Sequence, residues 1–284
     1  MELSEKQKEL LQNFANLISY GHSYLSRVGL KRKKTSIRKK LFFYMFGATQ
    51  SYAESILKIM APTKSHTSIY AHSGLIIFRS IFENLINISW IYACDSQKNA
   101  AIFHIDFLQS TLKYSNRYRN LMTKYKNNKY SNWDLTFGNK KKPEDWNDFI
   151  EELEKAIKKE QRKYCLDVNS KLPPIEQRCM QHDVYWETKN KLKQDNCLEK
   201  LYVTYYPYFS GVVHLTAQGL DTFRDRFSDN MSIDSHPNDI EALIPITYTT
   251  YFSLLELFLK QFGVYDKNAM RGYRLISKSL LHQT

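Results

Sequence analysis

The chain has 284 residues, of which 43% are hydrophobic and 25% are charged, and this balance excludes a disordered protein. It contains only 9 Gly and 7 Pro, whereas an all-β fold needs these residues in a turn every ~8–12 positions. The composition therefore predicts an all-α protein with long helices. The net charge of +12 favours an anionic partner.

Several classes of protein are excluded by missing motifs. The four cysteines form no Cys-x-x-Cys pair, so neither a zinc site nor a disulfide framework is expected, and a reduced, cytoplasmic setting is the simplest one. No signal-peptide pattern is present at the N-terminus, and Pro245 and Glu256 interrupt the least polar stretch, so no membrane contact is expected. Because there is no Gly-rich phosphate loop, nucleophile elbow or metal-binding signature, neither a metal nor a cofactor is expected.

In the first half of the chain, apolar residues recur with a helical period over 3–28. A basic run at 31–40 leads into a second helix that Pro62 ends, because proline disfavours helical geometry in the residue before it. A third helix is predicted over about 65–94 and a fourth over about 98–126.

The second half begins with a polar, basic connector at 127–142, after which Pro143 opens a charged helix to about Cys165. Residues 166–195 are expected to be irregular around Pro173 and Pro174. A helix over about 197–227 contains Pro207, which is expected to kink or restart it. The last long helix is predicted over 239–262, and a short basic segment finishes the chain.

These elements predict a single bundle of about seven main helices, with residues 1–284 forming one domain. Its core spans about 40–225, and the helices at 3–28 and 239–262 pack on that core. The connector at 127–142 is the best candidate boundary, but both halves carry too many apolar faces to fold alone.

A narrow polar stripe follows one face of the third helix. His72, Arg79, Glu83 and Asn87 lie within about 80° of one another on a helical wheel, whereas apolar residues fill most of the rest. Arg79 and Glu83 are one turn apart, which is the spacing of an ion pair. The stripe is either a structural pair that holds the bundle together or the lining of a polar cleft.

A second polar stripe is predicted on the helix that contains Pro207. Tyr206, Ser210 and His214 follow one another at four-residue spacing along one face. Histidine changes charge near neutral pH, so His214 is either an acid–base group that Tyr206 and Ser210 orient or a hydrogen-bonded core residue. The catalytic interpretation needs Arg79 and Glu83 to face this stripe across the bundle.

The basic run is a candidate surface for phosphate groups, because dense cations release counterions from a nucleic acid. Phe42, Phe43 and Tyr44 follow it and could stack on bases. Alternatively, the basic run is only the solvent-exposed start of a helix and serves solubility. The cations of the run are Lys31, Arg32, Lys33, Lys34, Arg38, Lys39 and Lys40. Isolated histidines, His182 among them, show no ligand spacing and are assigned no role.

The segment from Ser73 to Glu83 resembles the Arg-Ser-x-x-Glu helix of a bacterial domain-of-unknown-function family, number 5677. Leu172-Pro173-Pro174-Ile175-Glu176, followed by Tyr205-Tyr206 and Ser210-x-x-x-His214, is similar to the closing segment of that family. The resemblance covers about residues 40–225.

More broadly, the chain resembles the HEPN superfamily of toxin and antiviral ribonucleases, which implies a HEPN-like core. Those enzymes carry an arginine four to six residues before a histidine on one helix. Here the corresponding positions before His214 are Pro207, Tyr208 and Phe209, so Arg79 of the third helix would have to supply the cation.

The leading hypothesis is a cytoplasmic RNA-targeting toxin or phage-defence protein, with metal-independent endoribonuclease activity at Arg79, Glu83, Ser210 and His214. Tyr206, His72, Asn87 and the basic run would then bind the substrate, RNA rather than DNA. The main rival is a non-enzymatic module that binds nucleic acid or protein, and a third alternative is a nucleotide or small-ligand sensor using the same cleft. An antitoxin or defence-complex protein, or a second copy of the chain, is the expected protein partner.

Overall fold

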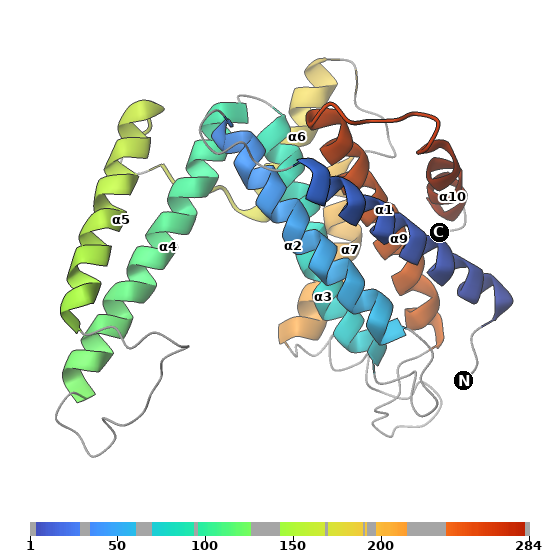
Figure 1. Ribbon diagram of the computed structural model, residues 1–284, viewed down its shortest axis with the longest axis horizontal. Helices are drawn as coiled ribbons and strands as arrows, with labels where there is room; N and C mark the ends of the chain where they lie inside the picture. The colour runs from blue at the N-terminus through green and yellow to red at the C-terminus, as the bar shows by residue number, and fades with distance from the viewer. Residues whose placement is uncertain are drawn as a thin grey trace. The chain divides into compact units, whose positions relative to one another are not determined.

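The computed structural model describes residues 4–28, 35–60, 70–93, 96–125, 143–167, 170–189, 191, 197–214 and 237–281. These residues form nine helices and no strand, so the all-α prediction is confirmed for the part of the chain that is described (Figure 1). The helices are α1 (Glu5–Val28), α2 (Ile37–Met60), α3 (Tyr70–Tyr92), α4 (Ser96–Tyr125), α5 (Pro143–Lys163), α6 (Ile175–Thr188), α7 (Leu198–His214), α9 (Pro237–Gln261) and α10 (Arg271–Leu281).

The described helices outnumber the seven expected from the sequence because one segment was expected to be irregular and another was given no secondary structure. The stretch 166–195 contains α6, which starts directly after Pro174. Pro174 itself is extended, with φ −52° and ψ 156°, and it directly precedes the first helical residue, where the missing N–H of proline removes no hydrogen bond from the helix. The short basic segment near the C-terminus is also helical, as α10. Helix α7 continues through Pro207 as far as His214.

Contacts divide the chain into two compact units. The first comprises Met1–Cys94 and Pro174–Thr284 and holds α1, α2, α3, α6, α7, α9 and α10, and the second is Asp95–Pro173 with α4 and α5. The connector at 127–142 belongs to the second unit and lies outside the described residues. That the whole chain is one domain stays a prediction.

The second unit is an antiparallel pair of helices. Ala101 and Ile105, near the start of α4, share an apolar cluster with Ile157, near the end of α5. Toward the other end of α4, Arg119 donates a hydrogen bond to Asn147 at 3.0 Å. Early residues of one helix therefore meet late residues of the other, and the apolar stripe of each helix is buried against its partner.

Aromatic rings form the centre of the first unit. Phe46 of α2 stacks on Phe258 of α9 with ring centres 4.3 Å apart, and Phe14 of α1 meets Tyr251 edge-on at 6.0 Å. Phe42 also packs edge-on against Phe258 and is only 1% exposed. The expectation that Phe42 stacks on nucleic-acid bases is therefore wrong, because this ring is part of the core.

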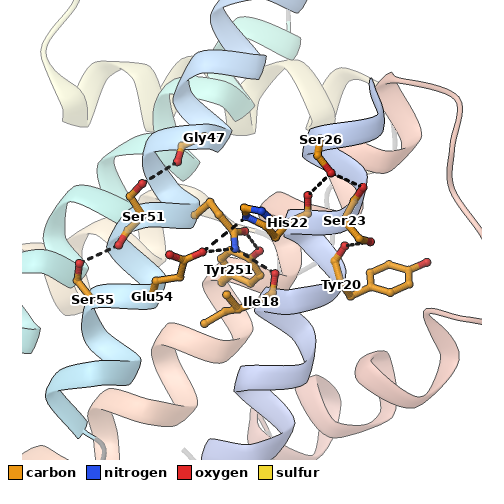
Figure 2. Close-up of polar contacts among 11 residues, drawn as sticks. Ile18, Tyr20, His22, Ser23, Ser26, Gly47, Ser51, Glu54, Ser55 and Tyr251 are labelled. Carbon is orange, nitrogen blue, oxygen red and sulfur yellow. Dashed lines mark hydrogen bonds and ion pairs between the residues drawn. The ribbon is translucent and has the colours of Figure 1, made fainter. Parts of the chain in front are cut away.

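A polar cluster ties α1, α2 and α9 together beside these rings (Figure 2). Gln50 of α2 is 3% exposed, and its amide nitrogen donates to the carbonyl oxygen of Ile18 at 3.0 Å and to Glu54 at 3.0 Å. The hydroxyl of Tyr251 donates to the amide oxygen of Gln50. Both ends of this buried amide therefore have partners from other residues, which a stable core requires.

Helix α3 is the most apolar helix of the first unit. Its segment Ser73–Tyr92 is long and apolar enough to cross a membrane, but 56% of that window is buried inside the protein. Phe78, Ile81 and Ile86 are fully buried. This burial is what a core helix of a globular protein shows, and it is the setting in which the polar residues of α3 need partners.

The close approach of α1 to α9 depends on Gly21. A methyl group at this position would collide with the hydroxyl of Tyr251 and lie 3.1 Å from the amide oxygen of Gln50. Gly21→Ala should therefore lower the free energy of unfolding, by about 1–3 kcal/mol as overpacking usually does. The measurement is the midpoint of urea denaturation.

Gly47→Ala is the matched control in α2. Its new methyl group would meet only Leu25, at 3.8 Å, which is an ordinary contact. Because glycine inside a helix is less stable than alanine by roughly 0.5–1 kcal/mol, Gly47→Ala should stabilise the protein. Equal midpoints for the two variants would contradict this account of the α1–α9 contact.

Candidate functional site

The polar stripe of α3 contains the ion pair that its spacing predicts. Arg79 and Glu83 are one turn apart, and Nε of Arg79 donates to Oε1 of Glu83 at 2.9 Å. The two side chains are 19% and 32% exposed. The pair therefore lies at the edge of the first unit, neither deep in its core nor fully in solvent.

Tyr206 of α7 completes this pair from another helix. Its hydroxyl accepts a hydrogen bond from Nη2 of Arg79 at 2.9 Å and donates to Oε1 of Glu83 at 3.0 Å. One residue of each predicted stripe thus reaches the other across the bundle. We refer to Arg79, Glu83 and Tyr206 as the Arg79 cluster.

The cluster holds its members in defined protonation states. Burial disfavours the charged form of Arg79, but the hydrogen bond to Glu83 and the field of Tyr206 outweigh it and raise the pKa of Arg79 above its ordinary value. Burial also raises the pKa of Tyr206, and the Glu83 charge adds to this, whereas Arg79 works against it. At neutral pH the cluster therefore offers a guanidinium cation beside a phenol that keeps its proton.

Asn87, another residue of the α3 stripe, faces α6 instead of α7. Asn87 is 9% exposed and accepts a hydrogen bond from Nη1 of Arg178 in α6, which is 6% exposed. One turn further, the indole of Trp90 donates to Gln181 at 2.7 Å. Asn87 therefore joins α3 to α6 in a buried contact, and its predicted role in substrate binding has no support from its position.

The other candidate residues of the two stripes are Ser210, His72 and His214. Ser210 lies on α7 one turn after Tyr206 and is half-buried. The side chains of His72 and His214 lie outside the described residues, although both belong to helices. A catalytic set of Arg79, Glu83, Ser210 and His214 stays a prediction.

The predicted basic surface is only partly described. Lys31, Arg32, Lys33 and Lys34 lie outside the described residues, and Lys40 lies in the first turn of α2. The guanidinium of Arg38 lies 4.6 Å from the ring centre of Tyr92, and the ammonium of Lys39 lies 5.8 Å from that of Phe262. These two cations are thus placed against aromatic rings of the same unit, an arrangement that stabilises them locally.

Sequence reasoning missed a group on α6. Nδ1 of His182 lies 2.8 Å from Oδ1 of Asp183, and Asp183 also accepts hydrogen bonds from the start of α7. No motif spacing marks these residues, because the helix that carries them was expected to be irregular. With a helix over this stretch, Arg178 and His182 would have been seen to lie one turn apart on one face.

A protein-family model agrees with the resemblance found in the sequence. The model, described as a family of unknown function (DUF5677), matches residues 39–231, which is more than half of the chain. The match includes all three residues of the Arg79 cluster and the whole of α6. No curated protein and no solved structure matches the chain.

Removal of one hydroxyl group tests the Arg79 cluster. Tyr206→Phe leaves Arg79 and Glu83 without their shared partner on α7, and hydrogen bonds to charged groups contribute about 1.5–3 kcal/mol. Because the pair is partly exposed, we expect a loss at the lower end, measured as a shift in the denaturation midpoint.

Tyr202→Phe is the control for this change. Tyr202 stacks on Tyr206 with ring centres 4.7 Å apart, but its hydroxyl forms no hydrogen bond within the described part of the chain. This variant should unfold within about 0.5 kcal/mol of the parent, as surface changes usually do. If both phenylalanine variants lost the same stability, the cluster would not join α3 to α7.

Proposed function

The chain belongs to DUF5677, a family of unknown function, and we propose that it is an RNA-targeting toxin or phage-defence protein with a HEPN-like core. The observation that carries this proposal is the Arg79 cluster itself. It brings a cation of α3 to the face of α7 on which Ser210 and His214 follow Tyr206 at four-residue spacing. The protein would act in the cytoplasm, without a metal or cofactor, and an antitoxin or defence-complex partner would restrain it.

The chemistry that suits these residues is cleavage of an RNA phosphodiester. His214 takes the proton of a 2′-hydroxyl group, whose oxygen attacks the adjacent phosphorus. The bond between phosphorus and the 5′-oxygen breaks, and the 5′-oxygen takes a proton from a water molecule as it leaves. Arg79 stabilises the negative charge that develops on the phosphate oxygens. Glu83 and Tyr206 hold the guanidinium in place, and Ser210 orients the imidazole. General acid–base help of this kind contributes about 10²–10⁴ in rate.

This arrangement differs from the HEPN pattern in the source of the cation. No arginine precedes His214 at the expected distance on α7. In the proposal Arg79 replaces it from α3, and the hydrogen bond between Arg79 and Tyr206 is what gives the replacement a geometric basis. The two helices would then form one composite site.

The test is an assay of RNA cleavage with chelator present. His214→Ala should reduce the rate at least about 10²-fold, because it removes the acid–base group. Arg79→Lys should also reduce the rate, because an ammonium group cannot keep both hydrogen bonds of the planar guanidinium. His22→Ala, on the exposed face of α1, is the control and should cleave at the parental rate. Parental cleavage by His214→Ala would remove the enzymatic proposal.

A second candidate function, binding of nucleic acid without catalysis, is favoured by the surface of α10. Arg271, Arg274 and Lys278 share one face of this helix at spacings of three and four residues, and Lys267 precedes it on the same side. They line a groove of about 340 Å³. Repeated cations along a groove suit a chain of phosphate groups.

Two further contacts indicate how this basic face is organised. Arg274 is held by Glu256 and by the hydroxyl of Tyr265, which fixes the side chain from behind. On the other side of α10, Leu280 is buried, and Met270, the residue directly before the helix, is buried as well. Leu275 is exposed on the basic face, but a single leucine is not the continuous apolar side that a helix needs to insert into a membrane, so this face suits a polyanion better.

The salt dependence of binding tests this second function. For single strands, the slope of log K against log salt concentration changes by about 0.7 for each phosphate contact. Replacement of Lys267, Arg271 and Lys278 by Gln should therefore reduce the slope for a uridine oligonucleotide by about 2. Replacement of the exposed Lys158, Lys159 and Arg162 of α5 is the matched control. An equal change of slope in both triple variants would assign the binding to net charge instead of to α10.

A further inference from the structure

A cavity lies where α3, α6, α7 and α9 meet, apart from the Arg79 cluster. Its volume is about 380 Å³, within the range of small-molecule sites. From α3 it is lined by Leu85, Ser89 and Tyr92, which follow Arg79 by six to thirteen residues, or roughly 9–20 Å along the helix axis. The cavity is therefore a different place from the cleft expected between the two polar stripes.

The wall of the cavity contains a histidine with a fixed orientation. Nδ1 of His182 lies 2.8 Å from Oδ1 of Asp183, and the His182 side chain is 11% exposed. Asp183 also accepts hydrogen bonds from the backbone N–H groups of Leu198 and Glu199, at 3.0 and 2.8 Å, and from the thiol of Cys197 at 3.1 Å. Four donors thus hold the carboxylate in place.

These contacts determine which nitrogen of His182 carries the proton. Burial acts to raise the pKa of Asp183, but the hydrogen bonds from His182, Glu199, Cys197 and Leu198 outweigh it and hold the pKa below that of an ordinary aspartate. An ionised carboxylate can only accept, so Nδ1 is the donor, and the neutral ring then has its lone pair on Nε2. Nε2 forms no hydrogen bond within the described part of the chain.

The roles of the two neighbouring residues are therefore different. Asp183 has a structural task, since it binds the first N–H groups of α7 and so fixes that helix against α6. Asp183 could bind these N–H groups without a histidine beside it, so the structural role of Asp183 does not explain why residue 182 is a histidine. His182 places a hydrogen-bond acceptor, Nε2, on the cavity wall, with its ring edge-on to that of Trp186 at 6.3 Å between ring centres.

The other groups that line the cavity define the ligand. Trp186 and four leucines, Leu85, Leu198, Leu201 and Leu257, provide apolar surface for a flat ring. The charged residues that line the cavity are Lys191, Lys260 and Glu256. Glu256 forms an ion pair with Lys260 at 3.1 Å, whereas Lys191 forms no ion pair among the described residues. The rim is thus net positive and favours an anionic group.

We propose that this cavity binds a small molecule composed of a planar heteroaromatic ring and an anionic group, with nucleoside monophosphates as the test class. Nε2 of His182 accepts a hydrogen bond from an N–H group of the ring, and Lys191 neutralises the anion at the rim. The inference does not depend on RNA cleavage or on the basic face of α10.

The experiment is isothermal titration of the full chain with AMP, GMP, CMP and UMP, with adenosine, guanosine and inorganic phosphate as partial ligands. At least one monophosphate should bind, raise the melting temperature, and bind at least tenfold more tightly than its nucleoside or phosphate alone. His182→Phe keeps a ring but removes Nε2, so it should weaken binding of that monophosphate at least tenfold.

Lys191→Ala provides a second variant that does not disturb the core, because this side chain is exposed. It should weaken binding of the monophosphate several-fold and leave binding of the nucleoside unchanged. Lys189→Ala, two residues away and not on the cavity wall, should change the affinity for neither ligand. His214→Ala removes the proposed acid–base group without breaking a bond of the Arg79 cluster, so it should bind as the parent does, which separates this site from the proposed RNA site. Absence of binding by all four monophosphates, or binding that neither His182→Phe nor Lys191→Ala weakens, would overturn the proposal.

Discussion

The polar groups of α3 need partners from other helices, and this requirement organises the first unit. The helix is apolar around most of its girth, so a charge or amide on it is costly to bury unless it is paired. Tyr206 of α7 meets Arg79 and Glu83, and Arg178 of α6 meets Asn87. These hydrogen bonds place α7 beside the turn of α3 that carries Arg79 and α6 beside the turn that carries Asn87. Apolar contacts alone would not fix which helix packs at which turn.

Helix α6 has a central place in this network. It binds α3 through Arg178 and through Gln181, which accepts from Trp90, and it binds the first turn of α7 through Asp183. The position of α7 in turn sets where Tyr206 meets Arg79. The Arg79 cluster and the His182 cavity are separate places, but the same placement of α6 and α7 produces both.

The sequence predicted part of the candidate site for local reasons. The ion pair between Arg79 and Glu83 follows from four-residue spacing on one helix. The sequence assigned Tyr206 to orienting His214, and only the structure showed that its hydroxyl bonds Arg79 and Glu83. The role of Asp183 could not be predicted, because it depends on a bond between residues fifteen positions apart on two helices. Phe42 was misjudged for a related reason, since its neighbours in sequence are basic whereas its neighbours in space are the rings of α9.

The sequence alone determined the all-α class, the positions of most helices and the membership of Arg79 and Glu83 in one pair, because helical periodicity and one-turn spacing are local properties. Only the tertiary structure decided that Pro174 starts a helix, that Asn87 faces Arg178, and that His182 lines a cavity. These features depend on which helices pack together, and packing is set by burial and hydrogen bonding between segments far apart in the chain.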